Sequence, residues 1–390
     1  MTQIAHTPLR TWTALLGLTF SAFIFNTSEF IPVALLSDIG ADFHRSEAAT
    51  GMLISVYAWA VMVLSLPLML ATTRFNMRRL LMALIALFAI CQGLSAIATD
   101  FHWLMGARLG VACTHAIFWS IISPIAIRLV DERHRPMALG MVVTGSSIAM
   151  VLGLPLGRVI GLWAGWRWTF GGIGVFAAIT FIYLAFTLPS VPSPGRFSLR
   201  SLPELWRNRA LVSIYAIALL IPTAYFICYS YIEPFLLRTA RMTPQSVTVA
   251  LMLYGGAGFL GSVAFSRWFN RNRHRFCTAT MWGIAVCMAL LLGSANVAEA
   301  AVFAVCLIFG MSATAFNVAF QAEIINHSPA VAAAVSMSIF SGIYNLGIGS
   351  GTALGGLVCT HLSIDYIGLA GAGIALLTLL LWRLRILRTA

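Results

Sequence analysis

Among the Asp, Glu, Arg and His residues within long apolar stretches of this sequence, three lie farthest from the ends of their stretches: Glu29, Arg108 and His115. A charge at the centre of a bilayer costs at least about 2.5 kcal/mol, so such residues are candidates for a functional role. A helix rises ~1.5 Å per residue, which places Glu29 and Arg108 at similar depths of about 10 Å. The sequence therefore predicts a Glu29–Arg108 pair that takes up and releases a proton. A static ion pair that fixes helix packing is the alternative.

His115 lies two helical turns from Arg108, so both side chains can share one helix face. Imidazole titrates near neutral pH and can both donate and accept a hydrogen bond. We expect His115 to relay a proton or to contact a ligand; a hydrogen bond to a neighbouring helix is the alternative. Trp119 and Ser123 extend the same face with an aromatic ring and a hydroxyl.

Amide and phenol side chains recur near the middle of other apolar stretches, several of them one turn apart. The candidate ligand-contacting residues among them are Asn26, Tyr57, Tyr225, Tyr229, Asn317, Gln321 and Asn345. Such a set suits a polyhydroxylated or otherwise polar neutral ligand better than a greasy one. For each amide the alternative is a hydrogen bond between helices, which is common in membrane bundles.

Twelve apolar stretches must position these residues. A bilayer core needs ~20 residues of helix to cross it, and every backbone polar group must be satisfied within its own element, which favours helices. The predicted spans are 13–36, 49–71, 78–98, 102–129, 137–161, 168–188, 210–237, 246–267, 277–294, 300–322, 331–357 and 365–384. The predicted fold is an all-α membrane protein.

The second half of the chain repeats the layout of the first. Glu29 and Glu233 close the first and seventh spans, and basic loops follow the second and eighth spans at 74–79 and 267–275. Six-plus-six repeats with a ligand site between them are typical of secondary transporters. We therefore expect two pseudo-symmetric six-helix bundles. Their predicted boundaries are 1–189 and 210–390, joined by a cytoplasmic linker at 190–209.

Composition restricts the class further. Hydrophobic residues make up 60% of the chain and charged residues 9%, against about a quarter charged in soluble proteins. The net charge of +12 comes from arginines gathered in alternate loops. The positive-inside rule then places both termini in the cytoplasm. Because these cations lie between spans, nucleic-acid binding is not expected.

No catalytic or ATP-binding motif is evident, so an enzyme or a self-contained ATP-driven pump is not expected. The seven cysteines lie singly, without metal-ligand spacing. We expect no metal and no cofactor, with a proton gradient as the energy source.

The segment FIFNTSEFIPVALLSDIGADF (23–43), followed by residues 51–70, resembles the drug/proton-antiporter branch of the major facilitator superfamily. Further segments resemble bacterial sugar efflux transporters of the arabinose-export type: ARLGVACTHAIFWSI (107–121), GLPLGRVIG (153–161), GWRWTF (165–170), YSYIEPF (229–235) and FSGIYNLGIGSG (340–351). The resemblance implies an inner-membrane protein, expected as a monomer, that exchanges arabinose and some galactosides for protons by alternating access.

The loop after the second span departs from this family's pattern. Thr73 stands where the family has Asp, and Asn76 where it has Gly. This departure leaves Arg74, Arg78 and Arg79 as the candidate gating residues.

The sequence thus predicts a proton-coupled exporter of small sugars in the bacterial inner membrane. Its expected partners are the sugar, protons and the lipid bilayer. Glu29, Arg108 and His115 are expected to couple transport to protons. A broad-specificity drug/proton antiporter is the main alternative, followed by a membrane receptor and, last, a membrane enzyme.

Overall fold

A computed structural model describes residues 9–72, 75–192, 207–328 and 333–389, and this part of the chain is helical throughout, without a strand. The helices of the first half are α1 (Leu9–Ala34), α2 (Leu36–Asp42), α3 (Glu47–Thr72), α4 (Met77–Ala96), α5 (Phe101–Leu129), α6 (Arg135–Ile148), α7 (Leu154–Ala164) and α8 (Trp166–Thr187). The helices of the second half are α10 (Arg209–Tyr229), α11 (Ile232–Arg238), α12 (Pro244–Trp268), α13 (Arg273–Ala295), α14 (Glu299–His327), α15 (Ala333–His361) and α16 (Ile367–Thr389).

Eleven helical stretches of the described residues are long and apolar enough to cross a membrane. The twelfth is α15, which has 29 residues. One of the twelve spans is compound, because α6 and α7 are joined by a π-helix, η2 (Ala149–Gly153). The predicted twelve-helix fold is confirmed, and each span begins and ends within a few residues of its predicted bounds. Much of the predicted linker, 193–206, lies outside the described residues.

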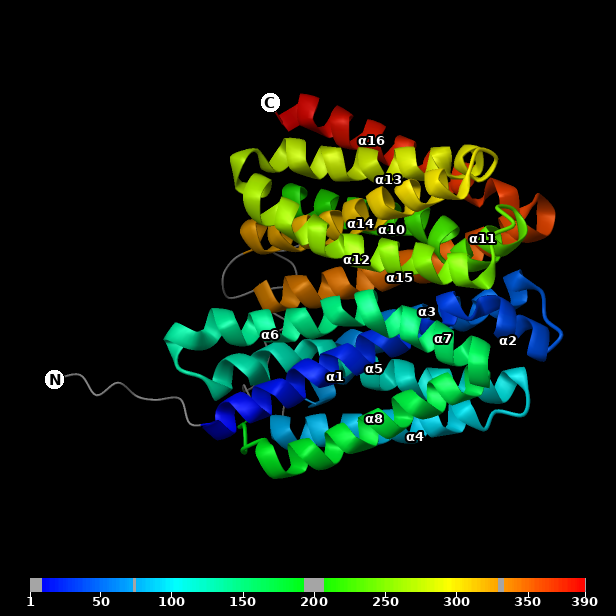
Figure 1. The fold of residues 1–390 in the computed structure, drawn as a ribbon. Helices are drawn as coiled ribbons and strands as arrows, with labels where there is room; N and C mark the ends of the chain where they lie inside the picture. Colours follow the sequence, from blue (N-terminus) through cyan, green and yellow to red (C-terminus); the bar gives the residue numbers. More distant parts are fainter. Residues whose placement is uncertain (1–8, 73–74, 193–206, 329–332, 390) are drawn as a thin grey trace.

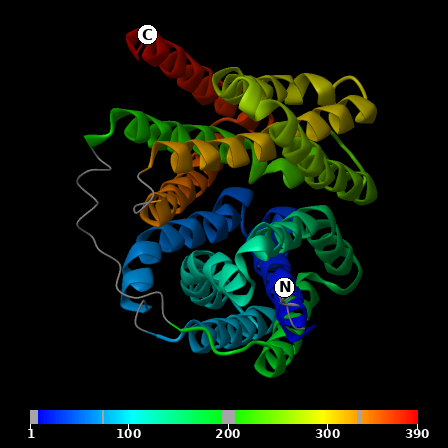
Figure 2. The same ribbon diagram turned by 90° about the vertical axis from the view of Figure 1, so that its left-hand side faces the viewer.

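The two halves use the same set of helix contacts (Figures 1 and 2). In the first half α4 packs on α5 and α8, and α1 packs on α6 and α8. In the second half α13 packs on α14 and α16, and α10 packs on α15 and α16. The structure therefore carries the internal repeat that the sequence predicts. We refer to α1–α8 as the N half and to α10–α16 as the C half.

The repeat corrects one sequence match. Both α1 and α10 break near one end and continue as short helices, α2 and α11, of seven residues each. Glu233 is the second residue of α11, and the second residue of α2 is Ser37. Glu29 lies before the break, inside α1. Glu29 and Glu233 are therefore not equivalent residues, although their local sequences are similar.

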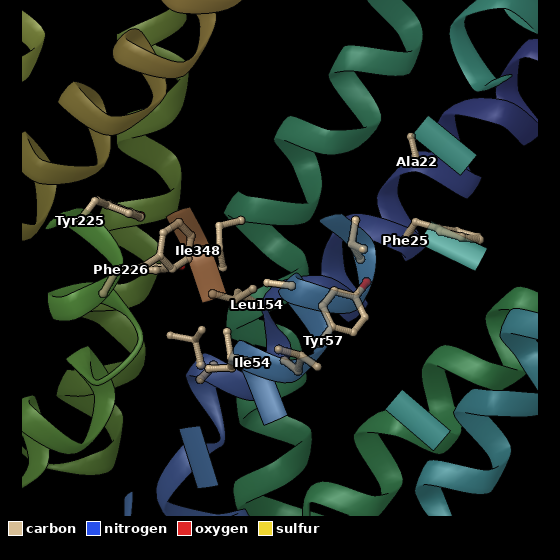
Figure 3. Packing of buried hydrophobic residues seen from close by; sticks show 14 of the residues in the cluster. Ala22, Phe25, Ile54, Tyr57, Leu154, Tyr225, Phe226 and Ile348 are labelled. Atoms are coloured by element: carbon tan, nitrogen blue, oxygen red, sulfur yellow. The ribbon is translucent and has the colours of Figure 1, made fainter. Parts of the chain in front are cut away.

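The halves meet along three contacts. Helix α3 of the N half packs against α15 of the C half. Within the N half, the main partners of α12 are η2 and α7, and α2 contacts α11. Gly255 of α12 lies so close to the Met150 carbonyl in η2 that a side chain there would clash. Figure 3 shows Ile54 and Leu154 of the N half beside Ile348 and Phe226 of the C half, all of them buried.

The two ends of the bundle differ. Helices α2 and α11 lie at one end, and the beginning of α1 and the end of α16 lie at the other (Figure 1). We call the first the α2–α11 end. Helix α12 contacts η2 and α7, which lie toward this end, more than α6, which leads toward the opposite end. The halves are therefore packed most closely at the α2–α11 end.

Candidate functional site

The first cluster of ionisable groups lies inside the N half, where α1 and α5 come together. The His115 Nε2 atom is 3.0 Å from Glu29 Oε2. The His115 side chain is 1% exposed and that of Glu29 is 14% exposed. Phe25 and Tyr57 flank the imidazole, with ring centroids 5.7 and 5.8 Å away. The pair is thus shielded on the histidine side and accessible on the carboxylate side.

A second group competes for the same imidazole nitrogen. The indole Nε1 of Trp119 donates to His115 Nε2 at 2.5 Å. A neutral Nε2 can accept the indole N–H, whereas a protonated Nε2 can only donate, and its partner is then Glu29. The Nδ1 atom of His115 is buried without a hydrogen-bond partner. The Trp119 contact requires Nε2 without a proton, and donation to Glu29 requires a proton on Nε2.

Arg108 does not pair directly with Glu29, which corrects the sequence prediction. Its Nη1 donates to Ser28 Oγ at 3.1 Å, and the guanidinium lies over the Tyr57 ring, 4.6 Å from the centroid. Ser28 and Glu29 are adjacent on α1, but their side chains point about 100° apart around the helix. Arg108 meets the Ser28 face and remains within electrostatic range of Glu29. It thus contributes positive charge near Glu29 without a salt bridge.

The Tyr57 ring lies beside both Arg108 and His115. Its side chain is buried, and its hydroxyl has no hydrogen-bond partner. Gln92 Nε2 donates to the same Ser28 Oγ that accepts from Arg108. Five residues from three spans are therefore brought together: Glu29 of α1, Tyr57 of α3, and Arg108, His115 and Trp119 of α5.

The C half presents amides toward this cluster. On α14, Gln321 Nε2 donates to Asn317 Oδ1 at 2.5 Å, and both side chains are half-buried. Tyr344 of α15 lies near Asn317 and within electrostatic range of Glu29. Polar groups of the C half therefore lie near the carboxylate of the N half.

Tyr344 and Trp59 were missed at the sequence level. Trp59 Nε1 donates to Ser350 Oγ at 3.4 Å, across the boundary between the halves. Tyr344 directly precedes the predicted Asn345, and on a helix adjacent residues point about 100° apart. Depth in the span predicts Asn345, but the side chain within electrostatic range of Glu29 is that of Tyr344.

Other predicted ligand contacts are engaged elsewhere. Asn26 Nδ2 donates to the Ser146 carbonyl at 3.0 Å, which is the helix-to-helix bond given as its alternative. Asn345 Nδ2 donates to Ser341 of its own helix at 3.0 Å. Ser123 is half-buried on α5. A role of these three residues in binding the ligand stays a prediction.

Tyr225 and Tyr229 belong to an aromatic cluster inside the C half. Tyr225 and Tyr254 are joined by a hydrogen bond between their hydroxyls, and Tyr229 stacks on both rings at 5.0 and 4.8 Å. The Tyr229 hydroxyl is buried without a partner. In this arrangement the two tyrosines pack against their own half.

The predicted gating arginines have separate roles. Arg78 Nη2 donates to the Ala185 carbonyl at 2.7 Å, tying the start of α4 to α8. Asn76 caps α4 by accepting from the backbone N–H groups of Arg78 and Arg79. Arg74 lies outside the described residues. The contacts of Arg78 and Asn76 are all within the N half.

A second buried ion pair joins the halves at the α2–α11 end. Arg158 Nη1 of α7 is 2.8 Å from Glu233 Oε1 of α11, and neither side chain is more than 1% exposed. Glu233 Oε2 accepts from Ser37 N at 3.2 Å and from Ser37 Oγ at 2.8 Å. Arg158 Nη1 also donates to the Ala34 carbonyl. Both carboxylate oxygens of Glu233 thus accept hydrogen bonds from donors of the N half.

This pair was missed because its partners are far apart in sequence and both lie near predicted span ends. The available signal was that each charge falls inside a predicted apolar span. A further pair, Arg238 of α11 with Glu47 of α3, joins the halves at the same end. Between described residues, both ion pairs that cross from one half to the other lie here.

A groove of about 580 Å³ lies on the N half between α1, the η2 region and α8, and its lining includes Leu16, Phe20, Phe23 and Tyr183. Its lining contains none of the predicted site residues. No group of three or more His, Cys, Asp or Glu that could hold a metal occurs in the described part of the chain.

Comparison with known proteins places these clusters on a familiar fold. Residues 18–347 match the family model described as Major Facilitator Superfamily. A bacterial homolog of the human lysosomal transporter Spinster, inward-facing and occupied, is 15% identical, with a TM-score of 0.76 over 95% of each chain. The nucleoside transporter NupG is 14% identical, with a TM-score of 0.76 over 96% of this chain and 99% of that one. A peptide transporter, POT, is 11% identical, with a TM-score of 0.78 over 99% and 96%.

Proposed function

The chain belongs to the major facilitator superfamily of membrane transporters, and from this premise we propose that it exports small sugars in exchange for protons. The substrates we propose are arabinose and galactoside-like solutes. The proton gradient supplies the energy and no cofactor is involved. The working unit is a monomer in the bacterial inner membrane, with both termini in the cytoplasm. The α2–α11 end then faces the outside.

The observation that carries the proposal is the shared Nε2 atom of His115. It lies 3.0 Å from Glu29 Oε2 and 2.5 Å from Trp119 Nε1. Addition of a proton to the cluster favours the His115–Glu29 pair, and its removal favours the Trp119 contact. Trp119 is half-buried and Glu29 is 14% exposed, so a substrate near them meets different hydrogen-bonding groups in the two states. Substrate and proton can therefore compete.

The amides of the C half support a polar substrate. Asn317 and Gln321 are half-buried and project from one face of α14, and Tyr344 extends this set from α15 toward Glu29. Amides and phenols both donate and accept, as sugar hydroxyls do. An aromatic ring such as Trp119 can pack on the apolar face of a sugar. We propose that the sugar binds between Trp119 of the N half and this amide set.

Alternating access follows from the two-half construction. The halves are tied by ion pairs at the α2–α11 end, so we assign this arrangement to a form whose site is closed to the outside. Rocking of 1–189 against 210–390 would separate α2 from α11 and expose the site there. Export proceeds when sugar loaded from the cytoplasm is released outside and a proton returns.

The test is the accumulation of radiolabelled arabinose in cells with and without this protein, each with and without a protonophore. Expression should lower accumulation, and the protonophore should abolish the difference. A Glu29→Gln variant, expressed at the same level, is the matched control and should not lower accumulation. Unchanged accumulation on expression of the wild type would contradict sugar export.

A panel of unrelated amphipathic toxins, run in the same cells, separates the sugar exporter from a drug/proton antiporter. Sugar export predicts no change in resistance. Broad resistance without an effect on arabinose would replace the sugar assignment and leave proton coupling in place. Solute counterflow in vesicles separates both from a receptor that does not transport.

A further inference from the structure

The ion pair at the α2–α11 end has an additional carboxylate beside it. Asp38 follows Ser37 on α2 and lies within electrostatic range of Arg158. One guanidinium therefore faces two carboxylates, Asp38 from its own half and Glu233 from the other. Arg158 pairs with Glu233 at 2.8 Å and forms no salt bridge with Asp38.

Both Asp38 and Arg158 keep a buried polar atom without a hydrogen-bond partner. The Oδ2 atom of Asp38 is buried and has no hydrogen-bond partner, and neither has Nε of Arg158, whose side chain is 1% exposed. Burial raises the pKa of Asp38 above its ordinary value, and the positive charge of Arg158 opposes that rise without cancelling it. In the closed arrangement Asp38 is thus the carboxylate without a partner.

Two other carboxylates at this end are already paired with arginines, while Arg45, in the loop after α2, lies over the Phe101 ring. Glu47 of α3 pairs with Arg238 of α11, and Asp42 of α2 pairs with Arg167 of α8. From α1 the cluster receives only the carbonyl of Ala34. The titratable residues of α12 are Tyr254 and Arg267, which lie well away from its Pro244 start. Among the described residues, Arg158 is the cation found to act electrostatically on Asp38.

We propose that Asp38 and Glu233 exchange Arg158 as the outer side opens and closes, and that closing loads a proton from the outside onto Asp38. When the C half moves away, Glu233 leaves with it, and Asp38 is the carboxylate that remains beside Arg158. When the halves close, Arg158 returns to Glu233 and Asp38 is left neutral. Asp38 is an external proton-binding site, distinct from the Glu29–His115 cluster.

The direction of the pH effect follows from this exchange. Burial raises the pKa of Asp38 in the closed form, in which Arg158 is paired with Glu233. Under the proposal, Arg158 pairs with Asp38 in the open form, and an opposite charge that close lowers the pKa of a carboxyl. A group with a higher pKa in the closed form stabilises that form at low pH, and the stabilisation is lost as pH rises through that pKa. Acid outside the cell therefore favours closure of the outer side. The assignment of the α2–α11 end to the outside of the cell rests on the proposed function.

The test measures the distance between the halves directly. Spin labels are placed at Thr99 and Val297, exposed residues in the α4–α5 and α13–α14 loops at this end, one in each half. Cys113 and Cys359, which are half-buried, are first replaced by serine. Pulsed electron paramagnetic resonance of the full chain in lipid nanodiscs then gives the closed fraction between about pH 5 and 8, a range chosen to bracket a raised carboxylate pKa.

The expected result is a ratio of closed to open molecules that rises as pH falls, by up to about tenfold per pH unit for one proton. Asp38→Asn, which mimics the neutral carboxyl, should remain largely closed at every pH. The matched control is Asp42→Asn, on the same helix, which should keep the wild-type pH dependence. Glu29→Gln should also keep it, because the central cluster is not the group titrated here.

Two outcomes would overturn the inference. One is a closed fraction of the wild type that does not change with pH. The other is an Asp38→Asn variant with the same pH dependence as the wild type. Arabinose counterflow in vesicles made from the same preparations tests the proposed function separately. Loss of pH dependence in Asp38→Asn without any arabinose counterflow would leave the proton site standing and remove the sugar assignment.

Discussion

The two buried ion pairs of this molecule differ in what they connect. Glu29 and His115 belong to one half and lie on α1 and α5. Arg158 and Glu233 belong to different halves and lie on α7 and α11. The first pair can gain or lose a proton while both helices stay packed. The second pair must break whenever the α2–α11 end opens.

This difference assigns the two pairs separate tasks. A cluster within one rigid half is suited to proton exchange, because its geometry is kept through the transport cycle. A pair between the halves is suited to holding one conformation, since its energy is present in that conformation alone. A ligand or proton can shift a conformational equilibrium only through such a difference between the two states.

The largest expected effect is on the pair between the halves. Arg158→Met leaves Glu233 buried without a cation, and breaking a buried pair in this way typically costs about 3–5 kcal/mol. We expect the closed form to be destabilised by that order, which the interlabel distance between Thr99 and Val297 measures. The double variant Arg158→Met with Glu233→Leu should recover most of the closed fraction. A single variant that remains as closed as the wild type would contradict this role.

The next effect concerns the pair within one half. Glu29→Gln removes a charge-assisted hydrogen bond worth ~1.5–3 kcal/mol, corresponding to a roughly 10- to 100-fold fall in the rate of proton-driven efflux. The closed fraction at the α2–α11 end should stay near that of the wild type. Efflux from preloaded cells and the label distance are measured on the same variant. A large change in distance without loss of efflux would reverse the assignment of the two clusters.

A smaller effect is expected for Trp119→Phe. The indole N–H stabilises the unprotonated Nε2 of His115, so its removal favours the protonated state. A neutral hydrogen bond contributes ~1 kcal/mol, and one pH unit corresponds to about 1.4 kcal/mol. The pH midpoint of sugar exchange should therefore move upward by about 0.7 units. Exchange rates across a pH series give the midpoint. His115→Asn, which cannot bind the proton, is the control and should show no such midpoint.

The smallest effect is expected for Arg238→Gln. This arginine is 62% exposed where it pairs with Glu47, and exposed pairs contribute about 0–1 kcal/mol. The closed fraction should fall slightly, and it should fall less in 1 M salt, where such pairs are screened. A loss as large as that of Arg158→Met would mean that the exposed pair, rather than the buried one, holds this end closed.

Apolar length and periodicity were sufficient to predict the twelve spans, because bilayer thickness fixes how long each must be. They were also sufficient to find Glu29, His115 and Arg108, since charges inside apolar spans are conspicuous. Depth alone could not predict that Arg108 would meet Ser28. That outcome depends on the rotation of α1 about its axis, which the packing of neighbouring helices sets.

The pair at the α2–α11 end depends on information that one sequence does not carry. Arg158 and Glu233 are brought together by contacts between halves, and α1 and α10 each break to form the short helices that carry Ser37 and Glu233. Similarly, the rotation of α15 places Tyr344 within electrostatic range of Glu29, whereas the Asn345 side chain bonds to its own helix. Helix position could be predicted, whereas helix rotation and contacts between halves could not.

The most direct test of the central claim is proton movement driven by sugar. Purified protein in liposomes that contain a pH-sensitive dye is given an arabinose gradient, with no other energy source. The account predicts a pH change that requires arabinose and reports protons moving in the direction opposite to the sugar. Glu29→Gln should show no such pH change, although that variant should still exchange labelled for unlabelled arabinose. Sugar movement without a pH change in the wild type, or an undiminished pH change in Glu29→Gln, would contradict it.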